Sequence, residues 1–283
     1  VFKVFELSNV SIVVVSFNSE AKLSELIPSI PNECELIIVN NAPKSLPKEL
    51  KNLRNFTEIK NPKNEGFGTA CNIGASAASK DFLFLLNPDT MLEDDCVTNL
   101  LSACEKFPDA SAFTPKITNR KNQEDFKRRS ILLDKKNWLS RPPKILSEIP
   151  VMGGAAIFLK KENFKKVGGF DEEIFLYHED DDLSLRLKNE VGSLMYCPQA
   201  KIFHDGGSSS SRSPSIAKLK GFHMGKSRVY AMKKYQIKNY KLKCIFFAII
   251  QLMSVEMLFS KRKRAKYLSF YQGVMEGIRE DLE

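Results

Sequence analysis

The chain has 283 residues, of which 43% are hydrophobic and 27% are charged, and this composition excludes an intrinsically disordered protein. Its length allows one large domain, or one domain with an appendage. The formal net charge of +9 belongs to the C-terminal quarter, because residues 1–213 carry 28 Lys and Arg against 29 Asp and Glu, while residues 214–283 carry 15 against 5.

Apolar runs alternate with helical patterns in the first third of the chain. Strands are expected over residues 11–17, 35–40, 56–60 and 81–87, and helices over 20–30 and 66–79. Continuous apolar runs suit strands covered on both faces, so the pattern predicts an α/β fold with a mostly parallel sheet flanked by helices. Such sheets bind ligands at the carboxyl ends of their strands, where Ser16, Asn40 and Asp89 are expected.

The middle of the chain begins with a polar, basic segment, residues 118–148, which we expect to form a long loop over the ligand-binding edge. Beyond it we expect strands over 153–159, 193–197 and 201–204, a turn over 168–171 and a helix that starts near residue 179. The Ser-rich tract 208–215 is a candidate hinge. We therefore expect a principal domain over 1–213 and a basic helical extension over 214–283.

Four consecutive carboxylates, Glu179, Asp180, Asp181 and Asp182, follow an aromatic stretch at the start of that helix. So much like charge at one point needs a partner, and a metal-dependent transfer to a hydroxyl group would use it. The alternative is that acidic residues simply favour a helix N-terminus, where the macrodipole and the free N–H groups stabilise them.

Short motifs occur in a fixed order along residues 10–207. They are Val-Val-Val-Ser-Phe-Asn at 13–18, Ile-Ile-Val-Asn-Asn at 37–41, Asn-Glu-Gly-Phe-Gly at 64–68, Leu-Leu-Asn-Pro-Asp at 85–89, Gly-Gly-Phe-Asp-Glu at 168–172 and Glu-Asp-Asp-Asp-Leu at 179–183. The ordered set resembles the family 2 glycosyltransferases, most closely their rhamnosyltransferase-like branch of inverting enzymes. The resemblance implies a GT-A fold, which carries a C-terminal helical extension here. It also implies sugar transfer from a nucleotide-diphosphate donor, such as dTDP-rhamnose or a UDP-sugar, to a hydroxyl of a glycan or lipid-linked acceptor in surface polysaccharide assembly.

The resemblance also implies a divalent metal ion, Mg²⁺ or Mn²⁺, which neutralises the diphosphate as it leaves. Asp89 in Asn-Pro-Asp takes the place of the family's metal-binding aspartate, and His204 is expected to complete the metal shell. There is an alternative for each residue. Asp89 could be only a turn or helix-capping residue, and His204 only a hydrogen-bonding side chain at a strand end.

Inversion requires a carboxylate that takes the proton from the acceptor hydroxyl, and by resemblance this base is Asp180. Glu179 is expected to orient the acceptor or a loop, and Asp182 to bind acceptor hydroxyls. Asp181 is expected to be a solvated charge at the start of the helix. Gly154 is expected to let the backbone approach the donor sugar or the acceptor.

The resemblance assigns the nucleotide contacts as well. Base and ribose are expected to meet Ser16, Asn18 and Asn40, ribose or phosphate to meet Asn87, and Gly66 with Asn72 to shape the loop against the nucleotide. The family usually has Asp where Asn40 stands. Asn accepts a pyrimidine N–H through its carbonyl oxygen, so the identity of the donor stays open. Tight helix–sheet packing explains the glycines equally well.

The extension combines a near-apolar stretch, residues 245–259, with the basic run 261–264. This pattern indicates peripheral contact with an anionic membrane and fits a polyprenyl-linked acceptor, whereas the alternative is a helix packed on the principal domain. The stretch is interrupted by Gln251 and Glu256 and is shorter than the roughly 18–20 residues that span a bilayer. No nucleic-acid recognition motif accompanies the basic residues.

Six cysteines without a CxxC pair, several of them in apolar stretches, indicate reduced core thiols and a cytoplasmic setting, at most peripheral on the inner face of the membrane. No basic-then-apolar leader opens the chain, so secretion is not expected. Two other functions stay open, a non-catalytic sugar-nucleotide-binding or scaffold protein of the same fold and a nucleotidyltransferase. The sequence leaves the oligomeric state undetermined.

Overall fold

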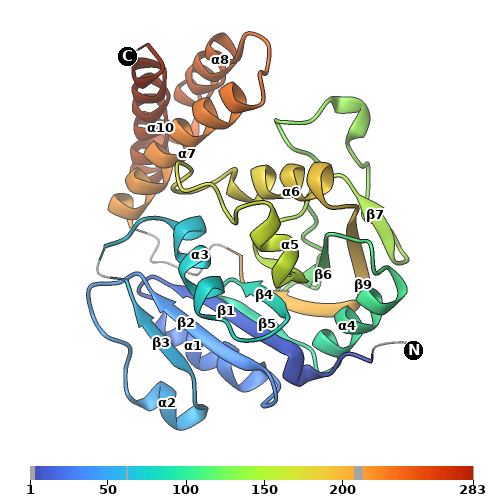
Figure 1. Ribbon diagram of the computed structural model, residues 1–283. Helices are drawn as coiled ribbons and strands as arrows, with labels where there is room; N and C mark the ends of the chain where they lie inside the picture. The colour runs from blue at the N-terminus through green and yellow to red at the C-terminus, as the bar shows by residue number, and fades with distance from the viewer. Residues whose placement is uncertain (1–3, 62, 207–212, 283) are drawn as a thin grey trace.

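The computed structural model describes residues 4–61, 63–206 and 213–282. Within these ranges one sheet of nine strands runs through the molecule, in the order β3-β2-β1-β4-β8-β6-β9-β5, with β7 also paired to β9 (Figure 1). The strands are β1 Val10–Ser16, β2 Glu35–Asn40, β3 Thr57–Lys60, β4 Phe82–Leu86, β5 Thr90–Leu92, β6 Ala112–Thr118, β7 Ser147–Ile149, β8 Ala156–Lys160 and β9 Leu194–His204.

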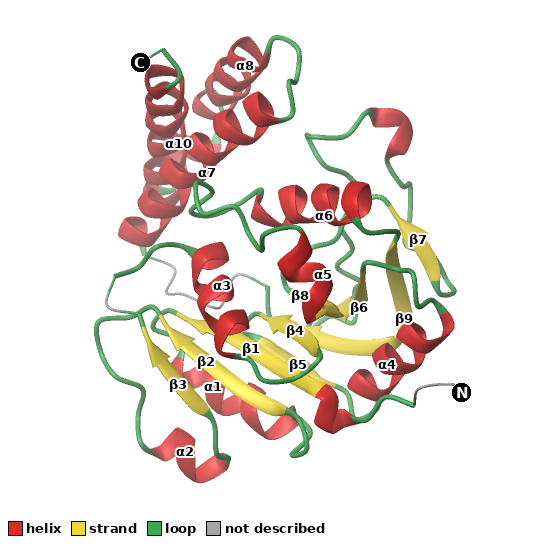
Figure 2. Ribbon diagram, viewed as in Figure 1, coloured by secondary structure: helices red, strands yellow, loops and turns green. Residues whose placement is uncertain are grey.

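Helices cover both faces of the sheet (Figure 2). Helices α1 and α4 pack on one face, and α3, α5 and α6 pack on the other. The helices are α1 Glu20–Leu26, α2 Glu49–Leu53, α3 Phe67–Ala77, α4 Cys96–Lys106, α5 Lys161–Lys166, α6 Glu179–Glu190, α7 Pro214–Lys234, α8 Tyr240–Leu252, α9 Glu256–Phe259 and α10 Lys261–Glu280.

Successive side chains of the central strands point to opposite faces and build two separate cores. Ile12 and Val14 of β1 join the core beneath α1 and α4, whereas Val13 and Val15 join the core beneath α3 and α6. Helix α3 lies so close to the sheet that a Cβ atom on Gly74 would approach Val13 Cγ1 to 2.3 Å. The small residues of this helix therefore set the thickness of the layer above the ligand-binding edge.

The predicted α/β fold is confirmed, but the sheet is mixed rather than mostly parallel. Strands β3, β2, β1 and β4 are parallel, so their carboxyl ends share one edge. Strand β8 then pairs antiparallel with both β4 and β6, and β9 pairs antiparallel with β5 and β7. Parallel neighbours need long, usually helical crossovers. Strands β6 and β8 are joined by a segment without an α-helix, and they pair antiparallel.

Other expected elements differ in extent. One strand, β9, replaces the two expected over 193–197 and 201–204, and its pairing with β6 shifts register between Pro115 and Lys116. The strand expected over 153–159 begins only at Ala156, which leaves the two preceding glycines in a loop. Most of the candidate hinge 208–215 falls on residues 207–212, which lie outside the described part of the chain.

The C-terminal helices form a layer of their own, in which α7 and α10 run parallel and nearly touch. A Cβ on Gly221 would lie 2.3 Å from the Lys266 carbonyl oxygen, and one on Gly273 would lie 1.9 Å from that of Phe222. Their core also includes Leu185 of α6, so the extension packs on the principal domain. No helix among the described residues has the length and apolar character needed to cross a bilayer.

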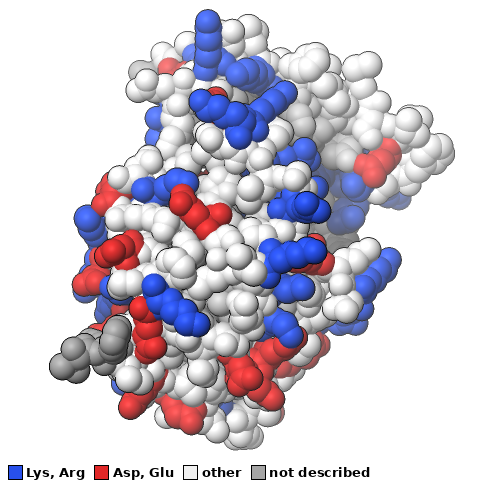
Figure 3. Space-filling view, turned by 90° about the vertical axis from the view of Figure 1, so that its right-hand side faces the viewer, with Lys and Arg blue, Asp and Glu red and all other residues white. Residues whose placement is uncertain are grey.

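Charge is distributed unevenly over the molecule, as the sequence indicates. On the face shown in Figure 3, acidic side chains gather toward the lower end, and basic ones predominate in the upper part, where the C-terminal helices lie. The six cysteines are free and buried, as expected. Their thiols are core side chains.

Candidate active site

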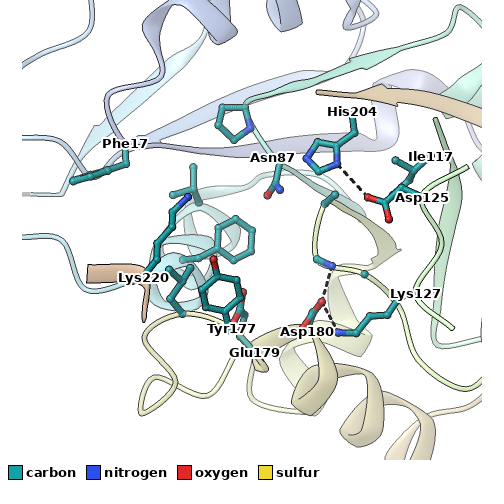
Figure 4. A pocket seen from close by; sticks show the side chains of 18 of the residues that line it. Phe17, Asn87, Ile117, Asp125, Lys127, Tyr177, Glu179, Asp180, His204 and Lys220 are labelled. Atoms are coloured by element: carbon teal, nitrogen blue, oxygen red, sulfur yellow. Dashed lines mark hydrogen bonds and ion pairs between the residues drawn. The ribbon is translucent and has the colours of Figure 1, made fainter. Parts of the chain in front are cut away.

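A cavity of about 540 Å³ opens at the carboxyl edge of the parallel strands. This volume is typical of a site for a small molecule. Segments far apart in the sequence line it (Figure 4). The lining includes Phe17 after β1, Asn41 after β2, Asn87 after β4, Asp125 and Lys127 of the long loop, Tyr177, Glu179 and Asp180 at the start of α6, His204 at the end of β9 and Lys220 of α7.

Asp180, the expected base, lies in this cavity and is held from several sides. Its Oδ2 accepts a hydrogen bond from the Gly154 N–H at 2.9 Å and is 2.7 Å from Lys127 Nζ. Its Oδ1 accepts the Asp181 N–H at 2.9 Å. A Cβ on Gly154 would come within 3.3 Å of Asp180 Cβ, so glycine allows the backbone to approach the carboxylate here. These contacts fix the orientation of the carboxylate.

Glu179 is the most unusual carboxyl group of the site. Its side chain lines the cavity although the residue is only 8% exposed, and Oε2 has no hydrogen-bond partner among the described residues. Burial and the neighbouring Asp180 charge raise the pKa of Glu179 to about 8. At neutral pH Glu179 is therefore largely protonated, and its hydroxyl is a hydrogen-bond donor directed at the cavity.

The turn before α6 aims these carboxyl groups. Tyr177 and His178 both have positive φ angles, 68° and 70°, which side-chain-bearing residues rarely adopt. The two left-handed residues reverse the chain immediately before Glu179. Asp181, expected to be solvated, is instead buried, with its carboxylate 2.8 Å from Lys127 Nζ and 3.0 Å from His178 Nδ1. Although burial opposes ionisation, these two partners lower the pKa of Asp181 to about 2.

A second charged group lies across the cavity. His204 Nε2 is 3.3 Å from Asp89 Oδ1, and His204 Nδ1 is 3.8 Å from Asp125 Oδ2. Burial lowers the pKa of His204, but the two carboxylates outweigh it and raise this pKa to about 9. Asp89 itself is buried behind the histidine and does not line the cavity. Asp89 and His204 are neighbours because Thr90, the residue after Asp89, pairs with His204 where β5 meets β9.

His204 at the cavity wall and Asp89 behind it offer an imidazole nitrogen and a carboxylate oxygen, donor types that Mn²⁺ and Mg²⁺ accept once the imidazole has given up its proton. Among the residues that the structure describes, no group of three or more His, Cys, Asp or Glu side chains has the arrangement of a metal shell. Phosphate and water oxygens would therefore supply the other ligands of an ion held by Asp89 and His204.

The structure divides the expected nucleotide contacts into two sets. Gly66 and Asn87 line the cavity, but Ser16, Asn18 and Asn40 do not. Their chain neighbours Phe17, Ser19 and Asn41 line it instead. Strand alternation explains why Phe17 replaces Ser16 and Asn41 replaces Asn40, because adjacent side chains of an extended strand end point in opposite directions. Asn18 lies beyond β1 in a bend with a positive φ of 53°. The sequence therefore located the strand ends correctly but not the residues that face the cavity.

Asn40 and Asn72 have partners within the protein. The Asn40 amide donates to the Lys44 carbonyl at 2.8 Å and accepts the Ala42 N–H at 3.0 Å, so it closes the loop after β2. The Asn72 amide donates to the Phe170 carbonyl at 2.9 Å and accepts the Phe170 N–H at 2.8 Å. It thereby ties α3 to the turn at 168–171. Both side chains shape the site from outside the cavity.

Asp182 also lies outside the cavity, although it was expected to meet the acceptor. The residue is completely buried, and its carboxylate pairs with Arg186 at 2.6 Å and with Lys234 at 2.6 Å. The Tyr235 hydroxyl donates to it at 2.9 Å. Because Lys234 and Tyr235 belong to the extension, Asp182 is a contact between the extension and α6.

Three charged residues of the lining were absent from the sequence prediction. Asp125 and Lys127 come from the long loop, and Lys220 comes from the first helix of the extension. Lys127 is one of many basic residues in residues 118–148, and nothing in the sequence marks it. Lys220 lies in the basic extension, which we expected to contact a membrane rather than to line the site.

Comparison with known proteins then decides the family. A family model described as Glycosyl transferase family 2 matches residues 11–168, which is more than half of the chain. The chain belongs to glycosyl transferase family 2. The matched region holds strands β1 to β8 and ends before the acidic start of α6, so Glu179 and Asp180 lie outside it.

Curated relatives share moderate identity with this family 2 chain. The N-acetylglucosaminyl-diphospho-decaprenol L-rhamnosyltransferase of Mycobacterium tuberculosis is 28% identical over 182 residues, which cover 54% of this chain and 59% of that protein. A poly-beta-1,6-N-acetyl-D-glucosamine synthase of Staphylococcus epidermidis is 23% identical over 209 residues, covering 69% of this chain and 49% of that protein. The matched part of the chain thus spans between about half and three fifths of the length of these relatives.

Solved structures of low identity share the fold. TarS residues 1–349 of S. aureus in complex with UDP-GlcNAc superposes with a TM-score of 0.55 at 13% identity, covering 96% of this chain and 92% of that chain. The mannosyltransferase PcManGT of Pyrobaculum calidifontis, in complex with GDP-Man and Mn²⁺, has a TM-score of 0.54 at 11% identity and covers 97% and 87%. The GT-A type of fold is therefore confirmed.

Proposed function

We propose that this family 2 chain is a metal-dependent, inverting glycosyltransferase that moves a sugar from a nucleotide-diphosphate donor to a hydroxyl of a glycan or lipid-linked acceptor in surface polysaccharide assembly. The observation that carries the proposal is that Asp180 and His204, which is paired with the buried Asp89, line one cavity. A rhamnosyl donor such as dTDP-rhamnose agrees with the mycobacterial relative, which is an L-rhamnosyltransferase. A UDP-sugar donor agrees with the UDP-GlcNAc bound by TarS.

Asp180 is the proposed base. Its carboxylate lies 2.7 Å from Lys127 Nζ and is oriented by the Gly154 N–H, so it can accept the proton of an acceptor hydroxyl as that oxygen attacks the anomeric carbon. Glu179 is largely protonated at neutral pH, because burial and the Asp180 charge raise its pKa to about 8, so it can donate a hydrogen bond to the acceptor. Asp89 and His204 would hold Mg²⁺ or Mn²⁺, which supplies charge neutralisation for the leaving diphosphate.

The test of the base is Asp180→Asn, with Asp94→Asn on the exposed surface as the matched control. Asp180→Asn is expected to retain donor binding in calorimetry while transfer falls by about 10²–10⁴-fold, because the amide cannot take the proton. Transfer at the rate of the Asp94→Asn control would remove Asp180 from the reaction. The product identifies the reaction class, because a glycosyltransferase releases nucleoside diphosphate, a nucleotidyltransferase releases pyrophosphate, and a binding protein releases neither.

We propose further that the extension contacts an anionic membrane at its cytoplasmic face, which brings the cavity to a polyprenyl-linked acceptor. Apolar side chains of α8 and the segment after it are exposed, with Phe246 at 67%, Met253 at 79% and Phe259 at 84%. The basic run 261–264 follows at once. Since α10 starts beside the N-terminal end of α7, which lines the cavity, this surface lies near the cavity.

Cosedimentation with vesicles tests the membrane contact. Wild-type protein is expected to sediment with vesicles that contain phosphatidylglycerol and to remain in solution with phosphatidylcholine alone, because both apolar insertion and charge contribute. Replacing Phe246 and Phe259 by Ser should reduce the bound fraction several-fold. Equal binding by wild type and the double variant would show that this surface does not face the membrane.

A further inference from the structure

Lys220 is the one cation of the described cavity lining for which no acidic partner is within ion-pair distance. It extends into the cavity from α7, on the side away from Lys127 and Asp180 (Figure 4). Lys127, by contrast, is neutralised by the carboxylates of Asp180 and Asp181 at 2.7 and 2.8 Å. Positive charge that a ligand can use therefore comes from Lys220.

The surroundings of Lys220 add to its positive potential. Burial lowers the pKa of Lys220, and the charge of Asp89 acts in the opposite direction. Helix α10 runs beside α7, and its Lys266 lies against Gly221, the residue that follows Lys220. Burial and the charges of Lys263, Arg262 and Lys220 lower the pKa of Lys266, although the charge of Glu256 opposes them. Two half-buried ammonium groups that repel each other favour an anion between or beside them.

The position of Lys220 selects the anion. The charge of Asp89, which lies behind His204, acts on Lys220, and Asn87 and His204 line the same cavity as Lys220. We infer that Lys220 binds the diphosphate of the nucleotide donor and neutralises the nucleoside diphosphate as it departs. This inference rests on the proposed glycosyl transfer. The anomeric C–O bond breaks with its electron pair on the diphosphate oxygen, the acceptor oxygen bonds to the same carbon, its proton passes to Asp180, and Lys220 remains protonated throughout.

The consequence for the architecture is that the extension completes the active site. The first turns of α7 contribute Ile216, Leu219 and Lys220 to the cavity lining. A boundary at residue 213 therefore separates chain segments but does not separate catalytic from non-catalytic parts.

Calorimetry with inorganic pyrophosphate in Mn²⁺ buffer tests the inference without knowledge of the base or the sugar. Lys220→Met is expected to weaken pyrophosphate binding about tenfold, the worth of one charge-assisted hydrogen bond, while Lys220→Arg stays within about threefold of wild type. Lys218→Met, an exposed lysine on the same helix, is the matched control and should bind as wild type does. Thermal unfolding of each variant verifies that it is folded.

Two outcomes would overturn the inference. One is equal pyrophosphate affinity for Lys220→Met and Lys218→Met in folded proteins. The other is a loss for Lys220→Met that affects farnesyl diphosphate, a mimic of a lipid-linked acceptor, but spares UDP, dTDP and GDP. Either result leaves the proposed transfer untouched, because nucleoside diphosphate release by the wild type is measured separately. Absence of that release in the wild type would instead refute the proposed function, whatever Lys220 binds.

Discussion

Replacing Glu179 by Gln should stabilise the protein at alkaline pH and leave it unchanged at acidic pH. In the folded state Glu179 keeps its proton up to about pH 8, because burial and Asp180 oppose ionisation. In the unfolded chain it loses the proton above its ordinary value of 4.5. Between these pH values the folded state binds more protons than the unfolded state, so the stability of the wild type falls as pH rises and levels off above about pH 8. Gln cannot ionise and escapes this loss.

The magnitude follows from the difference between 4.5 and about 8. At about 1.36 kcal/mol per pH unit it is at most roughly 5 kcal/mol above pH 8. Water that enters the cavity solvates the ionised carboxylate, so we expect a smaller effect, about 2 kcal/mol. For a chain of this size about 1 kcal/mol moves the melting temperature by roughly 2 °C. Glu179→Gln should therefore melt about 4 °C above the wild type at pH 9.

The assay is thermal unfolding of wild type, Glu179→Gln and Glu173→Gln from pH 5 to pH 9. Glu173 is exposed and two residues after Asp171 in the preceding turn, so its replacement removes the same charge from the surface. We expect the Glu179→Gln difference to grow between pH 5 and pH 8 and the Glu173→Gln difference to stay small. A Glu179→Gln difference that is flat across this range would show that Glu179 ionises as an ordinary surface carboxyl does.

Three further substitutions test other parts of the structure. Lys127→Met should lower the stability by about 3 kcal/mol, measured by denaturant unfolding, because it leaves the paired carboxylates without their cation; a change below about 0.5 kcal/mol would contradict the ion pairs. Gly273→Ala should cost about 1–3 kcal/mol, since its Cβ would lie 1.9 Å from a backbone oxygen of α7, whereas Gly206→Ala, with open space around it, should cost little. Asp89→Ala should abolish the Mn²⁺-dependent part of donor binding in calorimetry. If Mn²⁺ raises donor affinity as much in Asp89→Ala as in the wild type, Asp89 is not part of the metal site.

The elements that the sequence predicted correctly are those whose signal is local. Buried parallel strands such as β1, β2 and β4 are short continuous apolar runs, and this pattern needs no knowledge of the partner strands. The antiparallel pairing of the later strands was not predicted. The direction of strand β8 depends on the path of residues 118–148, and a polar loop carries no sequence signal for that path. The length of β9 escaped for a similar reason, since Pro198 suggests a break that the register shift against β6 accommodates.

The site shows the same division. Asp180, His204 and Asn87 stand in sequence motifs whose spacing sets their place at strand or helix ends, and each lines the cavity. Asn41 rather than Asn40 lines the cavity, because the side of a strand end that a residue faces changes with every position, and the sequence motif does not distinguish the two asparagines. Lys127 could not be predicted, because its role arises only when the folded loop places its ammonium group against buried carboxylates.

The acidic run that opens α6 illustrates why neither reading of the sequence was complete. Helix-dipole stabilisation alone would leave four solvated carboxylates, and a single metal site would leave most of them facing one ion. The fold instead gives each a different environment. Glu179 is protonated, Asp180 and Asp181 share Lys127, and Asp182 is held by cations of α6 and α7. Because Lys127 comes from the long loop and Lys234 from the extension, like charges can crowd one helix end only when those remote segments are folded onto it.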